Sequence, residues 1–571
     1  MCDVKWITLI SVICCGALLE GLTPEKPRSG ESKRGAALAE GRNGVVVGTT
    51  GPMAVRAGLE TLKKGGSAAD AAMATALAQV VECAGSYVSH AGILSMTYYE
   101  ADTGKVHYLN ACFNTPQGEK DALSIPRTGP SGRTALVPGF MAGVQAAHDR
   151  FGKLTRQDVF APAIAMADQG VKVSPLLTRF LKARKAVLSR LPETKRIFTK
   201  EGDTFYEEGD HFRQPQLANT LRQIAEHGAA FMYTGEWAEQ FVSAVQKEGG
   251  KISREDMSSY RVIWEEPLQT TWRGHEVYAP GFSSQGGVAM VEAIHLLEHA
   301  NLRERGHFAN TPASLFWLMQ ISHCQILGFL PETALKNFEG LDLTPSSRVK
   351  RETAAGIWRR MREGKWTYAA KVKNQASSAP AAHSDGIVVV DRWGNVAAVT
   401  HSINTALWGD TCLFVGGISI PDAAKFQQDL IQRAGAGKRL PDPMCPVIVL
   451  KEGKAVLGCS AIGGGLHQKT LQVLTSVLDF GMDPQNAVEQ PSFLLPDIDA
   501  TPPAARVERG KFDRKLLEAV RAMGQEVREV SPAEAGAFRG YWVGGHISPN
   551  GNLRRGVGTR QAPLPSVAEA Y

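Results

Sequence analysis

The pattern of the sequence changes abruptly near residue 383, and this change limits most strongly how the chain can fold. Residues 374–382, NQASSAPAA, are small and polar, which is typical of a linker. Residues 386–404 then run as an apolar stretch, the turn RWGN and a second apolar stretch, which predicts a β-hairpin. Residues 446–460 repeat this form around a Glu-Gly turn. The part of the chain after residue 383 is therefore expected to be rich in strands.

The part before residue 383 is expected to be rich in helices. In residues 51–81 apolar side chains recur at helical spacing, and Gly65-Gly66 interrupts the run. Ser67 is the expected N-cap of the helix that follows, with Asp70 at the capping-box position. Residues 93–113 interrupt the helical pattern with a predicted strand hairpin.

The N-terminus has the pattern of a signal peptide, which we assign to residues 1–22. Lys5 precedes an apolar stretch that ends before Glu20, and this stretch is short for a single membrane anchor, the alternative. Residues 23–42 are rich in Gly, Ser and Arg and are expected to be a flexible lead-in. The sequence therefore predicts a periplasmic or secreted protein with no stable membrane span after signal cleavage.

Composition excludes several classes of protein. Hydrophobic residues make up 43% and charged residues 21%, which argues against disorder, collagen and a coiled coil. A net charge of +6 over 571 residues is mild, so a dedicated nucleic-acid binder is not expected. The cysteines beyond the signal peptide show neither CxxC pairs nor metal-ligand spacing, which favours buried apolar cysteines over a disulfide framework.

Two local features are candidates for chemistry. Ser384 lies between His383 and Asp385, but consecutive side chains on a strand point to opposite faces, so these three cannot form a catalytic triad. Taken alone, Ser384 is more simply a loop serine. Three glycines at 463–465 follow a predicted strand and precede an apolar helix. Such a loop presents backbone N–H groups that suit an oxyanion or a phosphate, although a plain tight turn is the simpler alternative.

Five segments carry a resemblance to a known family. They are ETLKKGGSAADAAMATALA at 60–78, the Pro-Gly helix region at 135–174, the long match at 235–298, the strand pair VVDRWGNVAAVTHSIN at 389–404 and GVGTRQ at 556–561. In this order along the chain they resemble motifs of the γ-glutamyltransferases, which are N-terminal-nucleophile hydrolases, and the resemblance covers nearly the whole mature chain.

The resemblance implies an α+β fold, a four-layer αββα sandwich with two central sheets between helix layers. It also implies a precursor that cuts itself, here between His383 and Ser384, into a large subunit of residues 43–383 and a small subunit of residues 384–571. In the family the new N-terminal threonine is the nucleophile and its own α-amino group is the base. Ser384 stands at that position, and Ser384-Asp385 replaces the family's Thr-Thr or Thr-Ala pair. A serine hydroxyl beside a free α-amine, whose reference pKa is about 7.7–8.0, retains this chemistry.

The resemblance also assigns roles to residues around the nucleophile. Ser402 is expected to hydrogen-bond the nucleophile, and Asn404 is expected to bind substrate. Gly463 and Gly464 match the family's oxyanion hole. The expected partners are therefore a small-molecule amide or peptide substrate and the two subunits of one precursor; no cofactor and no metal are expected.

The family's contacts to the charges of a γ-glutamyl group are replaced in this sequence. Cys112 stands where the family has an arginine for the substrate carboxylate. Asp422 is the one acidic residue near the position that binds the substrate amine, and Asp442-Pro443 replaces a serine pair. We therefore expect weak or absent activity on glutathione and better activity on amides whose acyl part is less charged.

Two alternatives remain open from the sequence. HLLEH places His295, Glu298 and His299 in an HxxEH pattern, which on a helix could hold zinc for a peptidase. A partly exposed helix surface is the favoured interpretation of this short motif. The other alternative is an unprocessed, non-catalytic homologue that binds a ligand.

Overall fold

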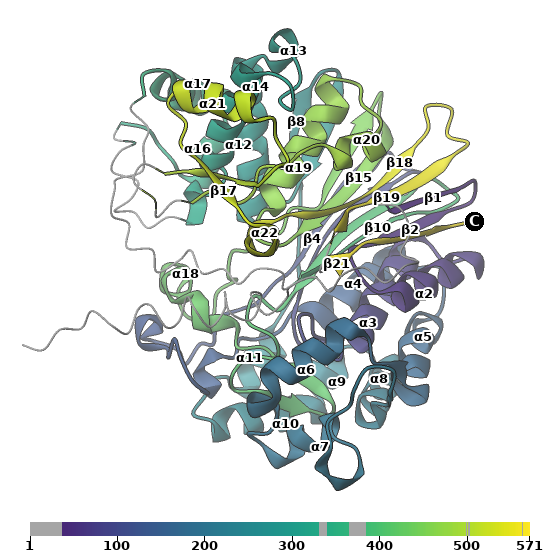
Figure 1. Ribbon diagram of the computed structural model, residues 1–571. Helices are drawn as coiled ribbons and strands as arrows, with labels where there is room; N and C mark the ends of the chain where they lie inside the picture. The colour runs from purple at the N-terminus through teal and green to yellow at the C-terminus, as the bar shows by residue number, and fades with distance from the viewer. Residues whose placement is uncertain are drawn as a thin grey trace, which may run out of the picture.

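Two antiparallel sheets of seven strands each lie face to face between two layers of helices (Figure 1). The computed structural model describes residues 37–329, 338, 340–364, 384–497, 500, 503–561 and 564–571. The four-layer αββα architecture predicted from the sequence is confirmed. The expected signal peptide and the linker at 374–382 lie outside the described residues.

Sheet I, as we name it, has the strand order β1-β19-β18-β15-β14-β9-β8, and sheet II has the order β22-β2-β10-β11-β3-β4-β7. The strands of sheet I are β1 (Ala37–Gly41), β8 (Leu268–Trp272), β9 (His275–Ala279), β14 (Val447–Lys451), β15 (Lys454–Ile462), β18 (Tyr541–Ile547) and β19 (Arg554–Gly558). The strands of sheet II are β2 (Val45–Gly48), β3 (Ile93–Glu100), β4 (Lys105–Ala111), β7 (Ile263–Glu265), β10 (Ser384–Val390), β11 (Val396–Ser402) and β22 (Val567–Ala570).

Helices cover the outer face of each sheet. The layer over sheet II holds α2 (Pro52–Lys63), α3 (Ala68–Glu82), α4 (Phe140–Phe151), α5 (Arg156–Gln169), α6 (Pro175–Leu188), α7 (Pro192–Phe198), α8 (Pro215–His227), α9 (Ala230–Tyr233), α10 (Glu236–Lys247) and α11 (Arg254–Ser259). The layer over sheet I holds α12 (Gln285–Ala300), α13 (Leu302–Arg305), α14 (Pro312–Cys324), α16 (Pro345–Arg348), α17 (Arg351–Arg362), α19 (Leu466–Leu474), α20 (Pro484–Glu489) and α21 (Arg514–Ala522).

Shorter elements complete the described chain. They are the helices α18 (Gln428–Ala434) and α22 (Pro532–Phe538), the single turns η1 (Ala122–Ser124), η2 (Gly132–Thr134), η3 (Glu201–Asp203), η4 (Leu327–Phe329), η6 (Ala423–Phe426) and η7 (Thr475–Asp479), and the strands β5 (Val171–Lys172), β6 (His211–Phe212), β12 (Leu413–Val415), β13 (Ile418–Ile420), β16 (Ala505–Glu508), β17 (Val527–Val530), β20 (Arg560–Gln561) and β21 (Leu564–Pro565).

The helices predicted over residues 51–81 are present as α2 and α3. Ser67 is the N-cap of α3, and its side chain and that of Asp70 form the predicted capping box. The carboxylate of Asp70 also accepts a hydrogen bond from the backbone N–H of Lys153 at 2.7 Å. The cap therefore fastens the start of α3 to the loop that precedes α5, in addition to satisfying its own N–H groups.

The predicted hairpins are also present, as the β3–β4, β10–β11 and β14–β15 pairs. The expectation that residues 23–42 form a flexible lead-in is wrong for residues 37–41, because these form strand β1. This strand pairs antiparallel with β19, which lies more than 500 residues further along the chain. A pairing partner at that distance leaves no local signal in the sequence.

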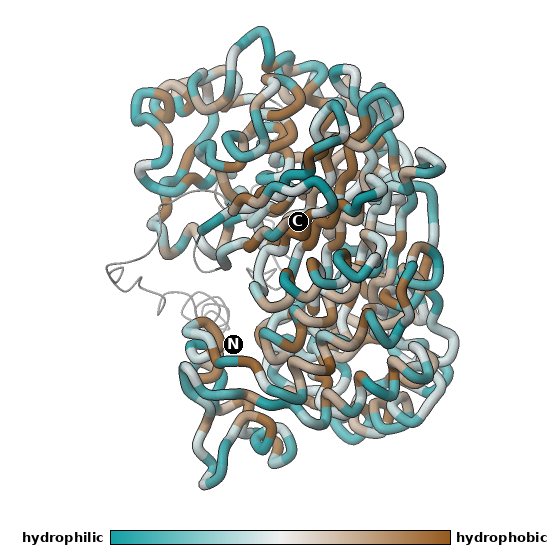
Figure 2. The backbone as a smooth tube through the Cα atoms, turned by 90° about the vertical axis from the view of Figure 1, so that its right-hand side faces the viewer, coloured by the Kyte–Doolittle hydropathy of each residue, from teal (hydrophilic) through white to brown (hydrophobic). Residues whose placement is uncertain are grey.

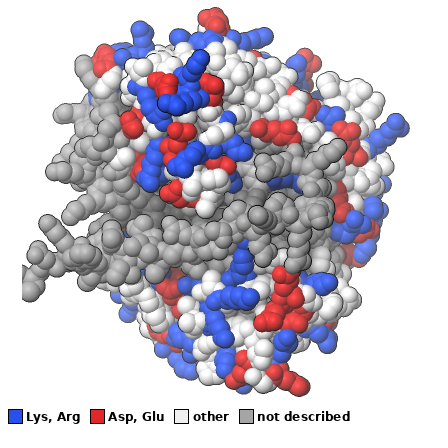
Figure 3. All heavy atoms as spheres, in the orientation of Figure 1, with Lys and Arg blue, Asp and Glu red and all other residues white. Residues whose placement is uncertain are grey.

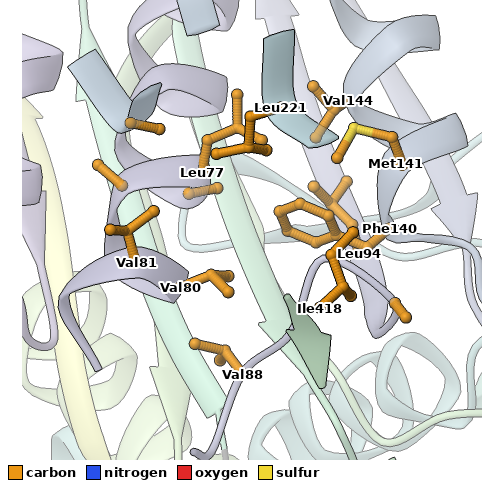
Figure 4. Close-up of a cluster of buried hydrophobic side chains, with 14 of the residues drawn as sticks. Leu77, Val80, Val81, Val88, Leu94, Phe140, Met141, Val144, Leu221 and Ile418 are labelled. Atoms are coloured by element: carbon orange, nitrogen blue, oxygen red, sulfur yellow. The ribbon is translucent and has the colours of Figure 1, made fainter. Parts of the chain in front are cut away.

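Three apolar cores separate the four layers. Valines of β2, β10 and β11 pack against strands of sheet I in the core between the sheets. The core under the helices of sheet II is the largest, and Figure 4 shows Leu77 and Val80 of α3 beside Phe140 of α4 in it. The most apolar segments run through the middle of the molecule in Figure 2. Since both of their faces are covered, β10 and β11 are buried almost throughout, and their residues 387–390 and 396–399 are all apolar.

Both sheets draw strands from before and after residue 383. In sheet II, β10 and β11 lie between β2 and β3, while in sheet I, β14, β15, β18 and β19 lie between β9 and β1. The helix-rich and strand-rich parts of the sequence are therefore interleaved, and each sheet needs both.

Three further expectations from the sequence concern the surface charge, the cysteines and the membrane-spanning helices. Basic and acidic side chains intermingle on the face seen in Figure 3. The six cysteines of the described chain are buried and form no disulfide, which confirms the expectation of buried cysteines over a disulfide framework. Within the described ranges, no helix is both long enough and apolar enough to cross a membrane.

Candidate active site

Ser384 is the first residue of β10 and starts a short chain of hydrogen bonds. Its Oγ donates to the Oγ of Ser402, directly opposite on β11, at 2.9 Å. The Ser402 hydroxyl in turn donates to Oδ1 of Asn404 at 3.0 Å and accepts from the Asn404 N–H at 3.1 Å. Ser384 is partly exposed, whereas Ser402 is buried. The structure thus brings the expected nucleophile together with Ser402 and Asn404, the two residues that the resemblance places beside it. The catalytic roles of all three remain predictions.

The Ser384 end of β10 faces sheet I. Strand alternation puts Gly386 on the same face as Ser384, and a Cβ atom on Gly386 would lie 2.8 Å from the hydroxyl of Ser460. On β11, Thr400 shares this face, and its hydroxyl lies 2.8 Å from that of Ser460. Ser460 belongs to β15, which leads into the glycine loop three residues later. The packing therefore brings the glycine loop toward the same end of the sheets as Ser384.

Asp385 points away from Ser384, as strand alternation predicts. Its Oδ1 accepts hydrogen bonds from the hydroxyls of Thr49 at 2.9 Å and Thr50 at 2.7 Å. Complete burial raises the pKa of the Asp385 carboxyl to about 7. His401, its register partner on β11, contacts Gln79 of α3 on the same outer face of sheet II.

The glycine loop at 463–465 links β15 to α19 and is packed tightly against residues 537–540. Gly463 has a φ of 85°, and a Cβ there would lie 2.5 Å from the carbonyl oxygen of Arg539. A Cβ on Gly465 would lie 2.6 Å from the Phe538 carbonyl oxygen, while one on Gly464 would meet its nearest atom at 3.0 Å. Two of the glycines are thus required by close approach of backbone, a reason beyond a simple turn.

Two N–H groups of this loop have partners within it or behind it. The N–H of Gly465 donates to the Arg539 carbonyl at 3.3 Å, and that of Leu466 donates to the Gly463 carbonyl at 3.2 Å. Neither of these two bonds uses the N–H of Gly463 or Gly464, and the oxyanion role expected of these two glycines remains a prediction. The loop also stands at the N-terminus of α19, where the helix dipole favours negative charge.

Cys112 and Asp442, two of the expected substrate-binding residues, contact each other. The Cys112 thiol donates to Asp442 Oδ2 at 3.1 Å, and the Met444 N–H donates to Asp442 Oδ1 at 2.8 Å. Both side chains are buried. Burial raises the pKa of Asp442 to about 6 and holds the pKa of the Cys112 thiol well above its usual range. The sequence identifies the two positions but not their mutual contact.

Arg439 is a residue of this region that the sequence analysis did not single out. Its guanidinium donates to the side chain of Asn114 at 2.7 Å, to the carbonyl of Asn110 at 2.8 Å and to the carbonyl of Arg261 at 2.6 Å. Its charge lowers the pKa values of both Cys112 and Asp442 from where burial alone would set them. The one sequence feature that could have drawn attention to Arg439 is its position three residues before Asp442.

Asp422, the remaining expected substrate residue, holds a loop. Its Oδ2 accepts hydrogen bonds from the N–H groups of Asp410 at 2.6 Å and Thr411 at 2.9 Å, and the side chain is buried. Nearby, the buried Lys425 forms an ion pair with Asp410, which also receives a hydrogen bond from Arg184 at 2.7 Å. The role of Asp422 toward substrate remains a prediction.

The HxxEH pattern does not assemble a metal site. His295 is buried and lies 2.8 Å from the hydroxyl of Thr270, while Glu298 is paired with Arg351 at 2.8 Å. His299 stacks on the ring of Trp358. Among the residues that the structure describes, no group of three His, Cys, Asp or Glu side chains could hold a metal ion. The zinc-peptidase alternative is therefore wrong for this motif, because its side chains serve packing and ion pairs.

Comparisons with known proteins agree in family and fold. The family model described as Gamma-glutamyltranspeptidase matches residues 54–556. The glutathione hydrolase proenzyme of Escherichia coli (strain K12) is 26% identical over 510 residues, which cover 84% of this chain and 85% of that protein. The acylase ACY 1 proenzyme of Pseudomonas sp. (strain SE83) is 26% identical over 476 residues, covering 79% and 82%. The crystal structure of a cephalosporin acylase from Bacillus halodurans superposes with a TM-score of 0.77 at 22% identity, covering 96% of this chain and 99% of that chain.

Proposed function

The chain belongs to the gamma-glutamyltranspeptidase family of hydrolases, and on that premise we propose that it is an exported, self-processed amidohydrolase or acyltransferase with Ser384 as nucleophile. The observation that carries this proposal is the hydrogen bond from Ser384 Oγ to Ser402 Oγ at the start of β10. The signal-peptide pattern of residues 1–22 supports export to the periplasm or the cell exterior.

Processing would expose the catalytic base. Cleavage between His383 and Ser384 frees the α-amino group of Ser384 and yields subunits of residues 43–383 and 384–571. Curated relatives of this chain are named proenzymes, which supports such a step. A free α-amine with a reference pKa of about 7.7–8.0 can remove the proton of the adjacent hydroxyl near neutral pH.

The proposed reaction uses the Ser384 hydroxyl, its α-amino group and the glycine loop. Ser384 Oγ attacks the carbonyl carbon of an amide while the α-amine takes the hydroxyl proton. The carbonyl oxygen gains negative charge, which N–H groups of Gly463 and Gly464 stabilise. The α-ammonium returns its proton to the departing amine, and an acyl ester on Ser384 remains. Water or an acceptor amine attacks this ester in the same way and restores the Ser384 hydroxyl.

The side chains near the expected acyl site favour an acyl group less charged than γ-glutamyl. A buried carboxylate and a buried ammonium each need a charged partner, since an unpaired buried charge is very costly. Here Cys112 and Asp442 engage each other, and Arg439 is committed to Asn110, Asn114 and Arg261. Lys425 and Asp410 likewise neutralise each other. An additional substrate carboxylate would also meet the acidic side chain of Asp442.

The test compares hydrolysis of γ-glutamyl p-nitroanilide with that of a panel of neutral acyl p-nitroanilides by the processed enzyme. We expect a higher kcat/KM for at least one neutral acyl compound and weak turnover of the γ-glutamyl compound and of glutathione. Efficient, saturable turnover of the γ-glutamyl compound alone would contradict the proposed acyl preference. A processed protein that cleaves no amide of either kind would instead favour the alternative of a non-catalytic, ligand-binding homologue.

A further inference from the structure

The second residue of β10 is tied to the other half of the chain by a set of short contacts. Thr49 and Thr50, which directly follow β2, donate their hydroxyl hydrogens to Oδ1 of Asp385. The Thr49 hydroxyl also accepts the N–H of Gly386 at 2.8 Å, and the Thr49 N–H donates to the Gly386 carbonyl at 2.9 Å. Four hydrogen bonds thus join residues 49–50 to residues 385–386.

The surroundings of the Asp385 side chain raise its pKa. It is fully buried, both hydroxyl donors converge on Oδ1, and Oδ2 has no hydrogen-bond partner within the described residues. The titratable groups around it are Glu82, Cys83 and Tyr87 from α3 and the loop after it, and the neutral His401 from β11. Burial raises the pKa of Asp385 to about 7, while the hydrogen bonds from Thr49 and Thr50 to Oδ1 oppose that rise and hold the carboxyl in place.

The hydrogen bonds of Asp385 matter most if its neighbour Ser384 becomes the end of a chain. Cleavage before Ser384 would make it the terminal residue of a strand, and terminal residues fray unless they are tied down. The nucleophile and its base would both belong to this terminal residue, so fraying would displace both at once. A displacement of about 1 Å can cost about 10²-fold in rate.

We propose that Asp385 is a positioning residue that clamps the new N-terminus of the small subunit to Thr49 and Thr50 of the large subunit, and so holds the Ser384 hydroxyl and α-amine in place. This inference rests on the proposed function, because it requires cleavage before Ser384. The clamp joins the two subunits one residue away from the reacting atoms.

The test measures kcat and KM of processed variants on the amide substrate that wild type turns over best. Asp385→Ala should lower kcat at least tenfold and change KM less than about twofold, because the clamp acts on the nucleophile and not on bound substrate. Asp385→Asn keeps an acceptor oxygen for both hydroxyls and should restore kcat to within about threefold of wild type. Thr50→Val should lower kcat in the same direction as Asp385→Ala, and Thr50→Ser should restore it.

Asp391, buried just beyond the other end of β10, supplies the matched control. It accepts the N–H groups of Ala68 at 2.9 Å and Asn395 at 3.0 Å, far along the strand from Ser384. Asp391→Ala should lower the melting temperature but leave kcat of the folded enzyme unchanged. Equal losses of kcat in Asp391→Ala and Asp385→Ala, or an unchanged kcat in folded Asp385→Ala and Thr50→Val, would overturn the clamp. An uncleaved or inactive wild type would refute the proposed function itself.

Discussion

At the scale of single residues, the resemblance and the geometry converge on Ser384, Ser402 and Asn404. These could be located from the sequence because the family resemblance assigns them to positions in, or just before, the predicted hairpin of residues 386–404. The sequence identified Cys112 and Asp442 as substrate-binding candidates but could not show that they contact each other. They are 330 positions apart, and only the folded chain brings the Cys112 thiol within 3.1 Å of the Asp442 carboxylate. Arg439 was missed for the same reason, because its partners Asn110 and Arg261 come from other parts of the chain.

Gly464 is the position in the glycine loop where a side chain tests function with the least damage to the fold. A Cβ at Gly464 has its nearest neighbour at 3.0 Å, against 2.5 Å at Gly463 and 2.6 Å at Gly465. Gly464→Val keeps the N–H, but its side chain crowds the loop and displaces that donor, so kcat should fall by up to the factor of about 10²–10³ that loss of one oxyanion donor costs, and Gly464→Ala should lower it less. Turnover and circular dichroism check this. Wild-type turnover in a folded Gly464→Val enzyme would refute the oxyanion assignment.

Asp442 makes the stability of the protein depend on pH. Its pKa rises from an ordinary value near 4 to about 6 in the folded protein, so the folded state binds the proton more tightly than the unfolded state. Its contribution is therefore most favourable in acid and is lost as the pH rises from about 4 through 6. Asp442→Asn should reduce the difference in melting temperature between pH 4.5 and pH 7. An unchanged difference would show that Asp442 does not titrate in this range.

At the scale of elements, local sequence patterns predicted the helices and the hairpins. They did not predict which strands pair when these are far apart in the sequence. The capping box of α3 and the β10–β11 hairpin each depend on residues close in sequence. The pairings of β1 with β19 and of β2 with β22 depend on the two ends of the chain. Likewise, the spacing of His295 and His299 in the sequence could not show that His295 contacts the hydroxyl of Thr270 and that His299 stacks on Trp358.

A buried ion pair fastens α16 to α12. Arg348 donates to the two carboxylate oxygens of Glu292 at 3.0 Å and 2.5 Å, with 3% and 0% of the side chains exposed. Removing one partner leaves a buried charge, so Arg348→Met should cost about 3–5 kcal/mol of unfolding free energy. The Glu292→Met, Arg348→Met double variant should cost less than the single one. Denaturant melts of both variants check this, and a double variant that is less stable than Arg348→Met would contradict it.

At the scale of the whole molecule, the interleaving of the two sheets explains how a cut chain can remain one protein. Each sheet contains strands from before and after residue 383, and the apolar core between the sheets is built from both parts. The αββα fold could be predicted through the family resemblance. The order of strands could not, because it depends on which apolar segments meet across hundreds of residues.

The two subunits should therefore stay together after cleavage. Separation would expose the apolar core between the sheets and the open edges of β2, β3, β9, β10, β11 and β14 to water. We expect the fragments to elute together on size exclusion in 1 M salt and to separate only in denaturant. Elution as two separate native fragments would contradict the interleaved fold.

The central claim is that the chain cuts itself before Ser384 and uses that residue as its nucleophile. Mass spectrometry of the purified active protein tests it most directly. The account predicts two chains, the smaller spanning residues 384–571, with Ser384→Ala uncut and inactive and Ser384→Thr cut. A single intact chain in protein that still hydrolyses amides, or a cut at another bond, would contradict it.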